Sequence, residues 1–503
     1  MRQKAKSQSG IRRPRAIPAQ QLDIKIISTT NQPLYVQIRD QIQTYIVNNT
    51  LLPGMRLPPV RNLAQQLGVN QITVAKAFRN LAEAKLIEGR RGGGSFIRAQ
   101  SAMPAMDHQT SGPLLAERLF ELARAPGVVS FTSNYPVPDS KAIRAFRSAL
   151  VEATEKALLN CFVYDSPIGR ANLREQIRAV LQSEGITSTI DSIMVTSGAQ
   201  QAIDLSIRAL LNPGKAIIIE QPAYYGTLNA ARALHVRVLE APLEADGMDL
   251  NIVEDYLSRN ESKVIYTNPT FQNPSGVTMS DAKRRALLAL ARRFGAVIIE
   301  DDHSHELRFS GKPVPAIRAL AEPNDLVLYV RGFGKTLLPG IRLGYLVMPD
   351  ALRQRLLAAR AYADLHSNSF VQEVLACFLS KGHHRGVIAR VKQAYGVRQK
   401  RLYQRLVVGM PKGTAINKPD GGLSLWLTLP EGADSSELYF RAVRRGVAFV
   451  AGDVFYAAPS RSRSLRVSFG FNNDDEVDEG VRRLCSVVTD LLSPRSVHNL
   501  FTP

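Results

Sequence analysis

Short apolar segments alternate with amphipathic helical stretches along most of this chain, and that alternation limits the possible folds more than any other feature. Five such segments, each bounded by polar residues, Pro or Gly, are SIMVTSG, AIIIEQP, KVIYTNP, AVIIEDD and LVLYVRGF. Helical periodicity fills the stretches between them, as in AQQAIDLSIRALL and DAKRRALLALARRFG. Strands separated by helices form mainly parallel sheets, whose ligand sites lie beyond the carboxyl ends of the strands. The pattern therefore predicts an α/β domain with its site at that edge.

A different pattern precedes it. Apolar residues recur every fourth position in PLYVQIRDQIQTYIV, which predicts one helix over 33–47. Two further helices are predicted in VRNLAQQL and QITVAKAFRNLAEAK, joined by a tight turn at Gly68. Two arginines and three glycines between short apolar stretches in EGRRGGGSFIRA are typical of a β-hairpin tip. Together these features predict a winged helix-turn-helix.

The charge distribution favours DNA as the partner of this segment. Residues 1–100 hold 16 Lys and Arg against 4 Asp and Glu, which is +12 of the net +20. Concentrated positive charge suits binding to phosphates, because each contact releases counterions. The residues expected to contact DNA are Arg61, Asn70, Gln71, Thr73, Lys76 and Arg79, with Arg90 and Arg91 in the wing; Val74, Phe78 and Leu81 are expected to face inward. Three helices alone would also suit a protein-docking module.

Composition narrows the setting. Cys161, Cys377 and Cys485 lie far apart without metal-ligand spacing, so we expect neither disulfides nor a metal site. No apolar run approaches the ~20 residues that span a bilayer. A cytoplasmic protein that does not associate with membranes is expected.

The expected organisation has five parts. They are a disordered basic arm at 1–30, for which a transit peptide is the alternative, a winged helix-turn-helix at 31–99, a linker at 100–115, a large domain at 116–390 and a small C-terminal α/β domain at 391–503.

The N-terminal segment resembles the GntR family over about sixty-five residues, through PLYVQIRDQI and LLPGMRLPPVRNLAQQLGVNQITVAKAFRNLAEAKLIEGRRGGGSFI. The family usually has Ser where this chain has Pro59, and Ser-Arg where it has Asn70 and Gln71. These departures put the operator sequence in question.

The larger part carries residues suited to a pyridine cofactor. In GFGKTLLPGIRLGY, Lys335 can form a Schiff base and Arg342 can bind a phosphate. Asp301, directly after a strand, can pair with a protonated pyridine nitrogen. Asn273 in NPTFQNPSG can donate to the ring's phenolic oxygen, and Tyr224 in EQPAYYG offers a stacking face. TSGAQQA opens a helix whose N–H groups suit a phosphate. Singly, each is an ordinary loop or capping residue.

The order SGAQ, EQPAYYG, NPTFQNPSG, EDD and GKT resembles the fold-type I aminotransferases, which use pyridoxal phosphate (PLP). With the N-terminal segment, the chain resembles the MocR branch of the GntR family. This implies a large domain with a mainly parallel seven-stranded sheet. The implied roles are Lys335 as the catalytic Schiff-base lysine, Asp301, Asn273, Tyr224 and His303 at the ring, Ser197, Ala199, Gln200 and Arg342 at the phosphate, Arg466 on a substrate or effector carboxylate, and Tyr164 reaching the partner subunit's phosphate.

Three residues depart from that pattern. His303 stands where a tyrosine usually tunes the ring oxygen, and Gly332 and Gly334 replace the serines usual near the lysine. An imidazole with a pKa near ~6.5 is expected to respond to pH where tyrosine would not. A lost hydroxyl removes a possible phosphate contact.

Two functions remain open at this stage. The first is a homodimeric PLP-dependent transcriptional regulator that binds repeated half-sites on double-stranded DNA and senses an amino compound or PLP itself. The alternative is an active aminotransferase acting on an amino acid, with an accessory DNA-binding domain; residual transaminase activity is compatible with either. A DNA-binding scaffold with a degenerate pocket is a third hypothesis, which the retained Lys335, Asp301, Asn273 and Arg342 disfavour.

Overall fold

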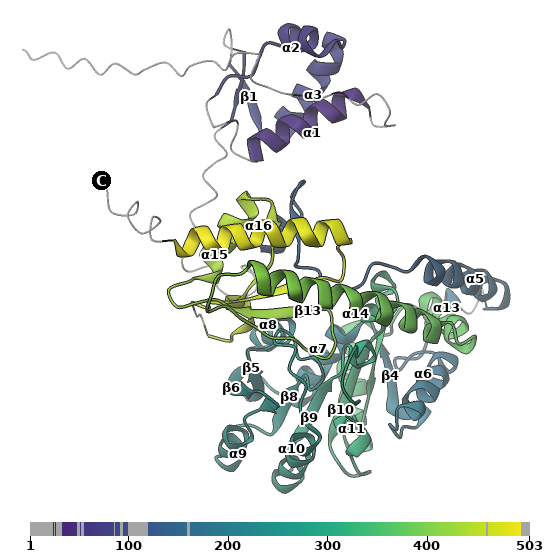
Figure 1. Cartoon of the computed structure of the whole chain (residues 1–503). Coiled ribbons are helices and arrows are strands. Elements are labelled where there is room, and N and C mark those ends of the chain that lie inside the picture. The colour runs from purple at the N-terminus through teal and green to yellow at the C-terminus, as the bar shows by residue number, and fades with distance from the viewer. Residues whose placement is uncertain are drawn as a thin grey trace, which may run out of the picture. The chain divides into compact units, whose positions relative to one another are not determined.

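The structure is a computed structural model that describes residues 24, 26, 33–47, 51, 55–84, 86–90, 94–98, 119–157, 161–458 and 461–493. Its chain forms two compact units, residues 1–110 with 444–446, and residues 111–443 with 447–503 (Figure 1). The expected linker at 100–115 and nearly all of the expected arm at 1–30 lie outside the described residues. Ile24, which falls within the expected arm, is buried in the core of the first unit.

The first unit contains the predicted winged helix-turn-helix. Its elements are α1 (Leu34–Val47), α2 (Val60–Leu67), α3 (Gln71–Glu83) and the antiparallel strands β1 (Ile87–Arg90) and β2 (Gly94–Ile97). Gly68 ends α2 at φ 64°, a left-handed conformation that glycine adopts without strain. The core is formed mainly by apolar side chains of the three helices and the hairpin, and Val74, Phe78 and Leu81 are buried in it as expected.

The second unit is built on an eight-stranded sheet. In spatial order its strands are β4 (Ile193–Thr196), β11 (Gly344–Val347), β10 (Val327–Gly332), β9 (Val297–Asp301), β8 (Val264–Thr267), β5 (Ala216–Gln221), β6 (Arg237–Glu244) and β7 (Gly247–Met248). Strands β7 and β11 run opposite to the other six strands, which all point in one direction. The predicted count of seven is too low because the two-residue strand β7 pairs with the end of β6.

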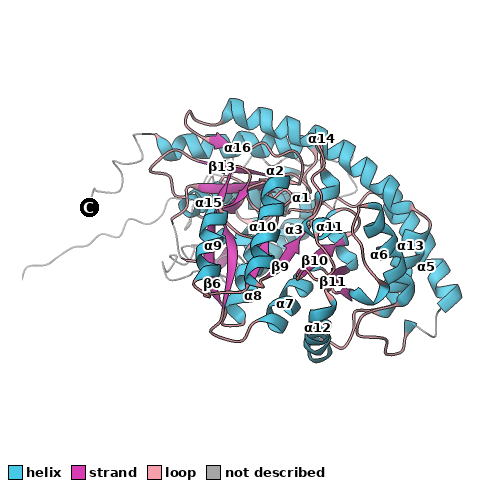
Figure 2. Cartoon of the chain, turned by 90° about the horizontal axis from the view of Figure 1, so that it is seen from below, coloured by secondary structure: helices cyan, strands magenta, loops and turns pink. Residues whose placement is uncertain are grey.

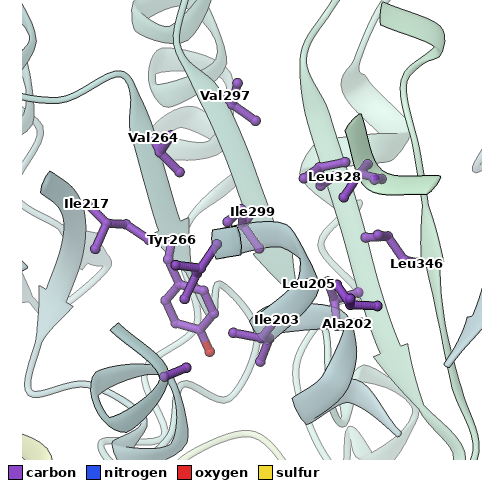
Figure 3. Close-up of a cluster of buried hydrophobic side chains, with 14 of the residues drawn as sticks. Ala202, Ile203, Leu205, Ile217, Val264, Tyr266, Val297, Ile299, Leu328 and Leu346 are labelled. Carbon is purple, nitrogen blue, oxygen red and sulfur yellow. The ribbon is translucent and has the colours of Figure 1, made fainter. Parts of the chain in front are cut away.

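Helices cover both faces of this sheet because its central strands are apolar on both sides (Figure 2). One face packs against α7 (Ala199–Leu210), α8 (Tyr225–Ala233) and α12 (Asp350–Ala363). The other packs against α9 (Leu250–Ser258), α10 (Asp281–Phe294) and α11 (Ile317–Leu320). Ile217 and Ile219 face the first set of helices and Ile218 the second. Figure 3 shows part of the first core, where side chains of α7 lie beside those of β5, β8, β9, β10 and β11.

The remaining elements surround this sheet. Helices α5 (Ser140–Ala157), α6 (Ala171–Ser183), α13 (Ser369–Ser380) and α14 (His383–Gly409) pack against one another. A four-stranded sheet follows in the order β12 (Ala415–Ile416), β13 (Ser424–Thr428), β16 (Ser464–Ser468) and β15 (Val450–Ala451), with α15 (Ser435–Arg444) and α16 (Asp474–Leu492). Strand β3 (Val129–Ser130) pairs with β14 (Val447–Ala448). The expected boundary at 390/391 falls inside α14, which continues through it. None of the described helices is long and apolar enough to cross a membrane.

Candidate functional site

A cavity of about 180 Å³ opens at the carboxyl ends of the parallel strands of the large sheet. Polar residues reach it from the loops after β4, β5, β8, β9 and β10, where the chain leaves each strand. Of the predicted site residues, eight line this cavity together: Ala199, Gln200, Tyr224, Asn273, Asp301, His303, Lys335 and Arg342. The edge of the sheet thus gathers side chains that are up to 143 positions apart in the chain, as open α/β sheets characteristically do.

Lys335 ends the short 3₁₀ helix η5 (Phe333–Lys335) that follows β10. Its ammonium donates to the main-chain oxygen of Asn134. Burial lowers the pKa of Lys335 to about 8, and the positive charges of Arg466 and Arg342 act in the same direction, whereas Asp301 opposes them. More of this amine is therefore neutral near neutral pH than in an ordinary lysine, and nucleophilic attack on a carbonyl requires the neutral form.

Asp301 ends β9 with a carboxylate that is only half satisfied. Its Oδ2 accepts a hydrogen bond from the Tyr266 hydroxyl at 2.7 Å, while its Oδ1 is buried without a hydrogen-bond partner in the described structure. Burial raises the pKa of Asp301 to about 6, against the lowering effect of that hydrogen bond. A buried carboxylate oxygen lacking a donor is suited to a cationic N–H of a bound ring.

The start of α7 lines one side of the cavity. Gly198 precedes the helix at φ 92°, and the first helical residues leave N–H groups unpaired within the helix. Arg342, at φ 51°, brings its guanidinium to 3.4 Å from the main-chain oxygen of Ser197. The Ser197 side chain itself does not line the main cavity; its hydroxyl lies 3.3 Å from that of Ser367. Converging N–H groups and a guanidinium suit a phosphate.

The two glycines near Lys335 are not required sterically. A Cβ at Gly332 would lie 3.4 Å from the main-chain nitrogen of Ala199, and one at Gly334 would lie 3.5 Å from Pro339. Gly332 has an ordinary extended conformation. Both positions can therefore hold a serine with little adjustment, and the missing hydroxyls are a property of this sequence rather than of its backbone.

Arg466 lies on β16 and is 2% exposed. Its guanidinium donates to Asn273 Oδ1 at 2.7 Å and to the Thr132 main-chain oxygen at 3.1 Å, while its Nε has no partner in the described structure. No described carboxylate forms an ion pair with it, and burial lowers its pKa. A buried guanidinium without a carboxylate is expensive unless a ligand supplies one.

His303 does not have the pH response expected from the sequence. Burial lowers its pKa to about 3, with further lowering by Lys335 and Arg466. The imidazole is therefore neutral throughout the physiological range. Its Nδ1 lies 2.9 Å from the side-chain nitrogen of Asn268.

Tyr164, another predicted site residue, does not line the cavity. Its side chain is 86% exposed and meets the His366 ring edge-on at 6.0 Å. Around it lie other exposed apolar side chains, among them Phe162, Val163 and Leu365.

In the first unit, six of the residues expected to contact DNA have described side chains, and all six are at least partly exposed. Arg61, Gln71, Lys76 and Arg79 are exposed and Thr73 is half-buried; Asn70, also exposed, caps α3 by accepting from the Ile72 N–H at 2.9 Å. Lys76 also stacks over the Tyr35 ring at 4.0 Å. Arg91 and the side chain of Arg90 lie outside the described residues.

Sequence reasoning missed several residues. Ile72 is 75% exposed in the first turn of α3, and Arg56 packs its guanidinium over Gly94 in the wing. Around the cavity, Asn134 lies 201 positions from the lysine it contacts, so no local pattern points to it. Tyr266 and Asn268 had a usable signal, because both belong to the KVIYTNP segment whose strand ends at the cavity.

The comparisons with known proteins agree with this geometry. Residues 126–484 match the family "Aminotransferase class I and II", and residues 34–97 match "Bacterial regulatory proteins, gntR family". Aromatic-amino-acid aminotransferase 1 of Thermococcus litoralis is 32% identical over 74% of this chain and 90% of its own length. The probable rhizopine catabolism regulatory protein MocR of Rhizobium meliloti is 26% identical over 86% of this chain and 90% of its own.

A solved structure shares the fold of the second unit. It is LysN, an α-aminoadipate aminotransferase from Thermus thermophilus in complex with N-(5'-phosphopyridoxyl)-L-leucine; it is 30% identical, with a TM-score of 0.68, over 75% of this chain and 97% of its own. The fold and its relatives imply PLP as the cofactor. The cavity fits it, because the unpartnered Asp301 Oδ1 suits a ring N–H and the start of α7 suits a phosphate. The chain therefore belongs to the class I and II aminotransferase family, with a gntR-family winged helix-turn-helix preceding its aminotransferase domain.

Proposed function

We propose that this protein is a transcriptional regulator whose aminotransferase-like unit binds PLP at Lys335 and responds to an amino compound. One observation carries the proposal: a single chain holds both an exposed recognition helix and a cofactor cavity with its polar residues in place. An enzyme alone has no use for a basic winged helix, whereas a regulator can use a cofactor site to recognise its ligand. Its work on DNA would locate it in the cytoplasm.

The cavity residues divide the work of holding the cofactor. When bound, PLP supplies an electron-withdrawing ring and an aldehyde that reacts with amines. Lys335 would attach it covalently, Asp301 would hold its ring nitrogen, and Tyr224 would stack on its face. The phosphate would be held by Ala199, Gln200, Arg342 and Ser197. Ser197 would contribute through its main chain, which lies beside the start of α7.

Arg466 indicates the class of effector. Its buried guanidinium pairs with no described carboxylate and lies 2.7 Å from Asn273, a residue of the cavity wall. A ligand carrying both an amine, for the cofactor, and a carboxylate, for Arg466, would meet both requirements. An amino acid is therefore the proposed effector, ahead of a simple amine or PLP itself.

On the DNA side, the first turn of α3 would read base edges and the wing would contact phosphates or a minor groove. Gln71 and Thr73 provide hydrogen-bonding groups, and the exposed Ile72 suits the methyl group of thymine. Arg61, Lys76, Arg79, Arg90 and Arg91 would add phosphate contacts.

A homodimer is part of the proposal. An exposed apolar patch is formed by four side chains that are each more than half exposed: Phe162, Val163, Tyr164 and Leu365. Such a patch often marks a surface that a partner covers. This patch adjoins the phosphate side of the cavity, because Tyr164 meets His366, and the next residue, Ser367, contacts Ser197. In a two-fold dimer the same patch of each subunit meets its equivalent, so Tyr164 of one subunit would come near the phosphate of the other.

The test combines both activities of the full-length protein. DNA fragments that the protein retains from sheared genomic DNA are isolated first. The affinity of the protein for these fragments is then measured by gel shift, with and without PLP and single amino acids. We expect one amino acid to change DNA affinity in the PLP-loaded protein and to have no effect in Lys335→Ala. Retention of no specific fragment, or an identical response in Lys335→Ala, would reject the regulator.

Adding the same amino acid to the PLP-loaded protein distinguishes a regulator from an enzyme. The aminotransferase relatives and the intact Lys335 and Asp301 favour an enzyme as the second candidate. A visible absorbance change that persists without product identifies a sensor. Accumulation of keto acid over many turnovers identifies an aminotransferase.

A further inference from the structure

Asn268, just after β8, contacts three groups behind the cavity, and it is 1% exposed. Its Oδ1 accepts from the main-chain N–H of Asn273 at 2.7 Å, and its Nδ2 donates to the main-chain oxygen of Asp301. A main-chain N–H can only donate and a main-chain carbonyl can only accept. These two partners therefore determine which atom of the Asn268 amide is Oδ1 and which is Nδ2, although the two atoms have nearly the same size and geometry.

The third contact of Asn268 then determines the state of a histidine. The same Nδ2 lies 2.9 Å from Nδ1 of His303. Because Nδ2 carries only hydrogens toward its neighbours, Nδ1 must offer a lone pair. A neutral imidazole that accepts at Nδ1 has its proton at Nε2, and an imidazolium, which donates from both nitrogens, does not fit.

We propose that Asn268 locks His303 in its neutral Nε2–H tautomer, which makes His303 a constant hydrogen-bond donor to the phenolic oxygen of bound PLP. The inference rests on the proposed cofactor site at Lys335. His303 lines the cavity together with Lys335, Asp301 and Asn273. With Nδ1 occupied by Asn268, the Nε2–H is the donor left for a ligand. Asn268 is a positioning residue in this arrangement, since it acts through the imidazole.

The charges around His303 also favour its neutral form. Burial is the main cause that holds its pKa to about 3, and the cations Lys335, Arg466 and His305 act in the same direction. Asp302 is the opposing charge. Lys335 belongs to η5, Arg466 to β16 and His305 to the short 3₁₀ helix η4 (His305–Leu307), so the cations come from three separate elements.

Glu220 at the end of β5 holds Asn268 in turn. Its Oε1 accepts from the Asn268 main-chain N–H and its Oε2 from the Thr267 hydroxyl, both at 2.9 Å. Burial raises the pKa of Glu220 to about 7, and protonation still leaves an oxygen that can accept from Asn268. The support of Asn268 therefore survives titration of this carboxyl.

The tautomer can be measured directly in the full-length protein labelled with ¹⁵N-histidine. The His303 signals are identified by their loss in His303→Gln. We expect a protonated Nε2 and an unprotonated Nδ1 that stay unchanged between about pH 5 and pH 8. A proton on Nδ1, or a titration within that range, would overturn the inference. This measurement needs neither cofactor nor activity.

The donor role is tested by the visible absorbance of the PLP-loaded protein as a function of pH. A donor to the phenolic oxygen stabilises its anionic form, so removing the donor makes the chromophore lose its proton at higher pH. We expect His303→Phe to raise the apparent pKa of the band by about one to two units. His303→Gln, which retains an N–H donor, should shift it much less. Equal shifts in the two variants, or none in either, would refute the role.

Two further variants separate positioning from general stability. Asn268→Ala should also raise the pKa of the band, because the imidazole is free to change tautomer. Gln399→Ala is the control, since Gln399 is a buried amide that donates to the main-chain oxygens of Pro419 and Gly421 and does not line the cavity. Equal effects of both variants on the band would reject a positioning role. A band that persists in Lys335→Ala would instead reject the proposed cofactor site.

Discussion

Asp301 and Asp302 are adjacent, both buried, and shifted in opposite directions. Burial raises the pKa of Asp301 to about 6, whereas the pKa of Asp302 falls below its usual range despite its burial, through its ion pair with His305 at 2.8 Å and further contributions from Arg331 and Tyr329. A carboxyl with a raised folded-state pKa binds its proton more tightly when folded, so it costs stability as the pH rises from about 4 to about 6.

We therefore expect Asp301→Asn to stabilise the cofactor-free protein above pH 6, by at most about 3 kcal/mol, while weakening PLP binding. Below about pH 4 the gain should vanish. Asp302→Asn is the matched control, and its effect on stability should have the opposite sign. The Asp302 carboxylate stabilises the folded protein above its unfolded pKa, and this stabilisation is lost in acid. Removing the carboxylate should therefore destabilise the protein at neutral pH. Thermal melts from pH 4 to pH 8 measure both; stabilisation of equal size in the two variants would contradict this account.

At the scale of the element, helix α3 combines two kinds of contact surface. Gln71 and the exposed Ile72 lie in its first turn, and Arg79 lies two turns later on an exposed position. Base edges carry sequence information and phosphates do not.

We expect Gln71→Ala to relax specificity at one base position, at a cost of about 1–3 kcal/mol on the preferred sequence. Arg79→Ala should weaken binding to all sequences alike and lower the salt slope by about one. Fluorescence anisotropy over a salt series checks both, and the reverse assignment would show that α3 is docked differently on DNA.

The β1–β2 wing is the second element with a predicted effect. Its strands pair in register from Ile87 opposite Ile97 to Arg90 opposite Gly94, so the main chain of Arg90 forms the last pair of the ladder. Arg90→Ala with Arg91→Ala should lower DNA affinity and flatten its salt dependence, because two phosphate contacts are lost. A gel shift unchanged by both substitutions would reject the wing as a DNA contact.

At the scale of the whole molecule, dimerisation should couple the cofactor site to the reading of DNA. Phe162 is 70% exposed and stacks on Phe370 at 5.9 Å, within the patch proposed to meet a second copy. Phe162→Asp would place a charge in that contact, and we expect the protein to sediment as a monomer with weaker PLP binding. Its affinity for DNA with two half-sites should fall, with that for a single half-site retained. Val408→Asp, which alters an 87% exposed side chain on α14 outside the patch, is the control. Loss of dimer in both variants would argue against this interface.

The amino-acid sequence by itself determined the two-part organisation, the elements and most of the cavity wall. The helices of the first unit and five strands of the large sheet were predictable because hydrophobic periodicity is a local property of the chain. Lys335, Asp301 and Asn273 were predictable because each lies at or beyond the end of a strand, and parallel strands bring their carboxyl ends to one edge.

Only the tertiary structure decided the electrostatics within that cavity. Asn273 meets Arg466, 193 positions away, and Lys335 contacts Asn134 across 201 positions. The sequence suggested a histidine that titrates near neutral pH, whereas burial and surrounding cations keep His303 neutral. Solvent exclusion and the distances between charges depend on contacts between remote segments, and no local pattern encodes them.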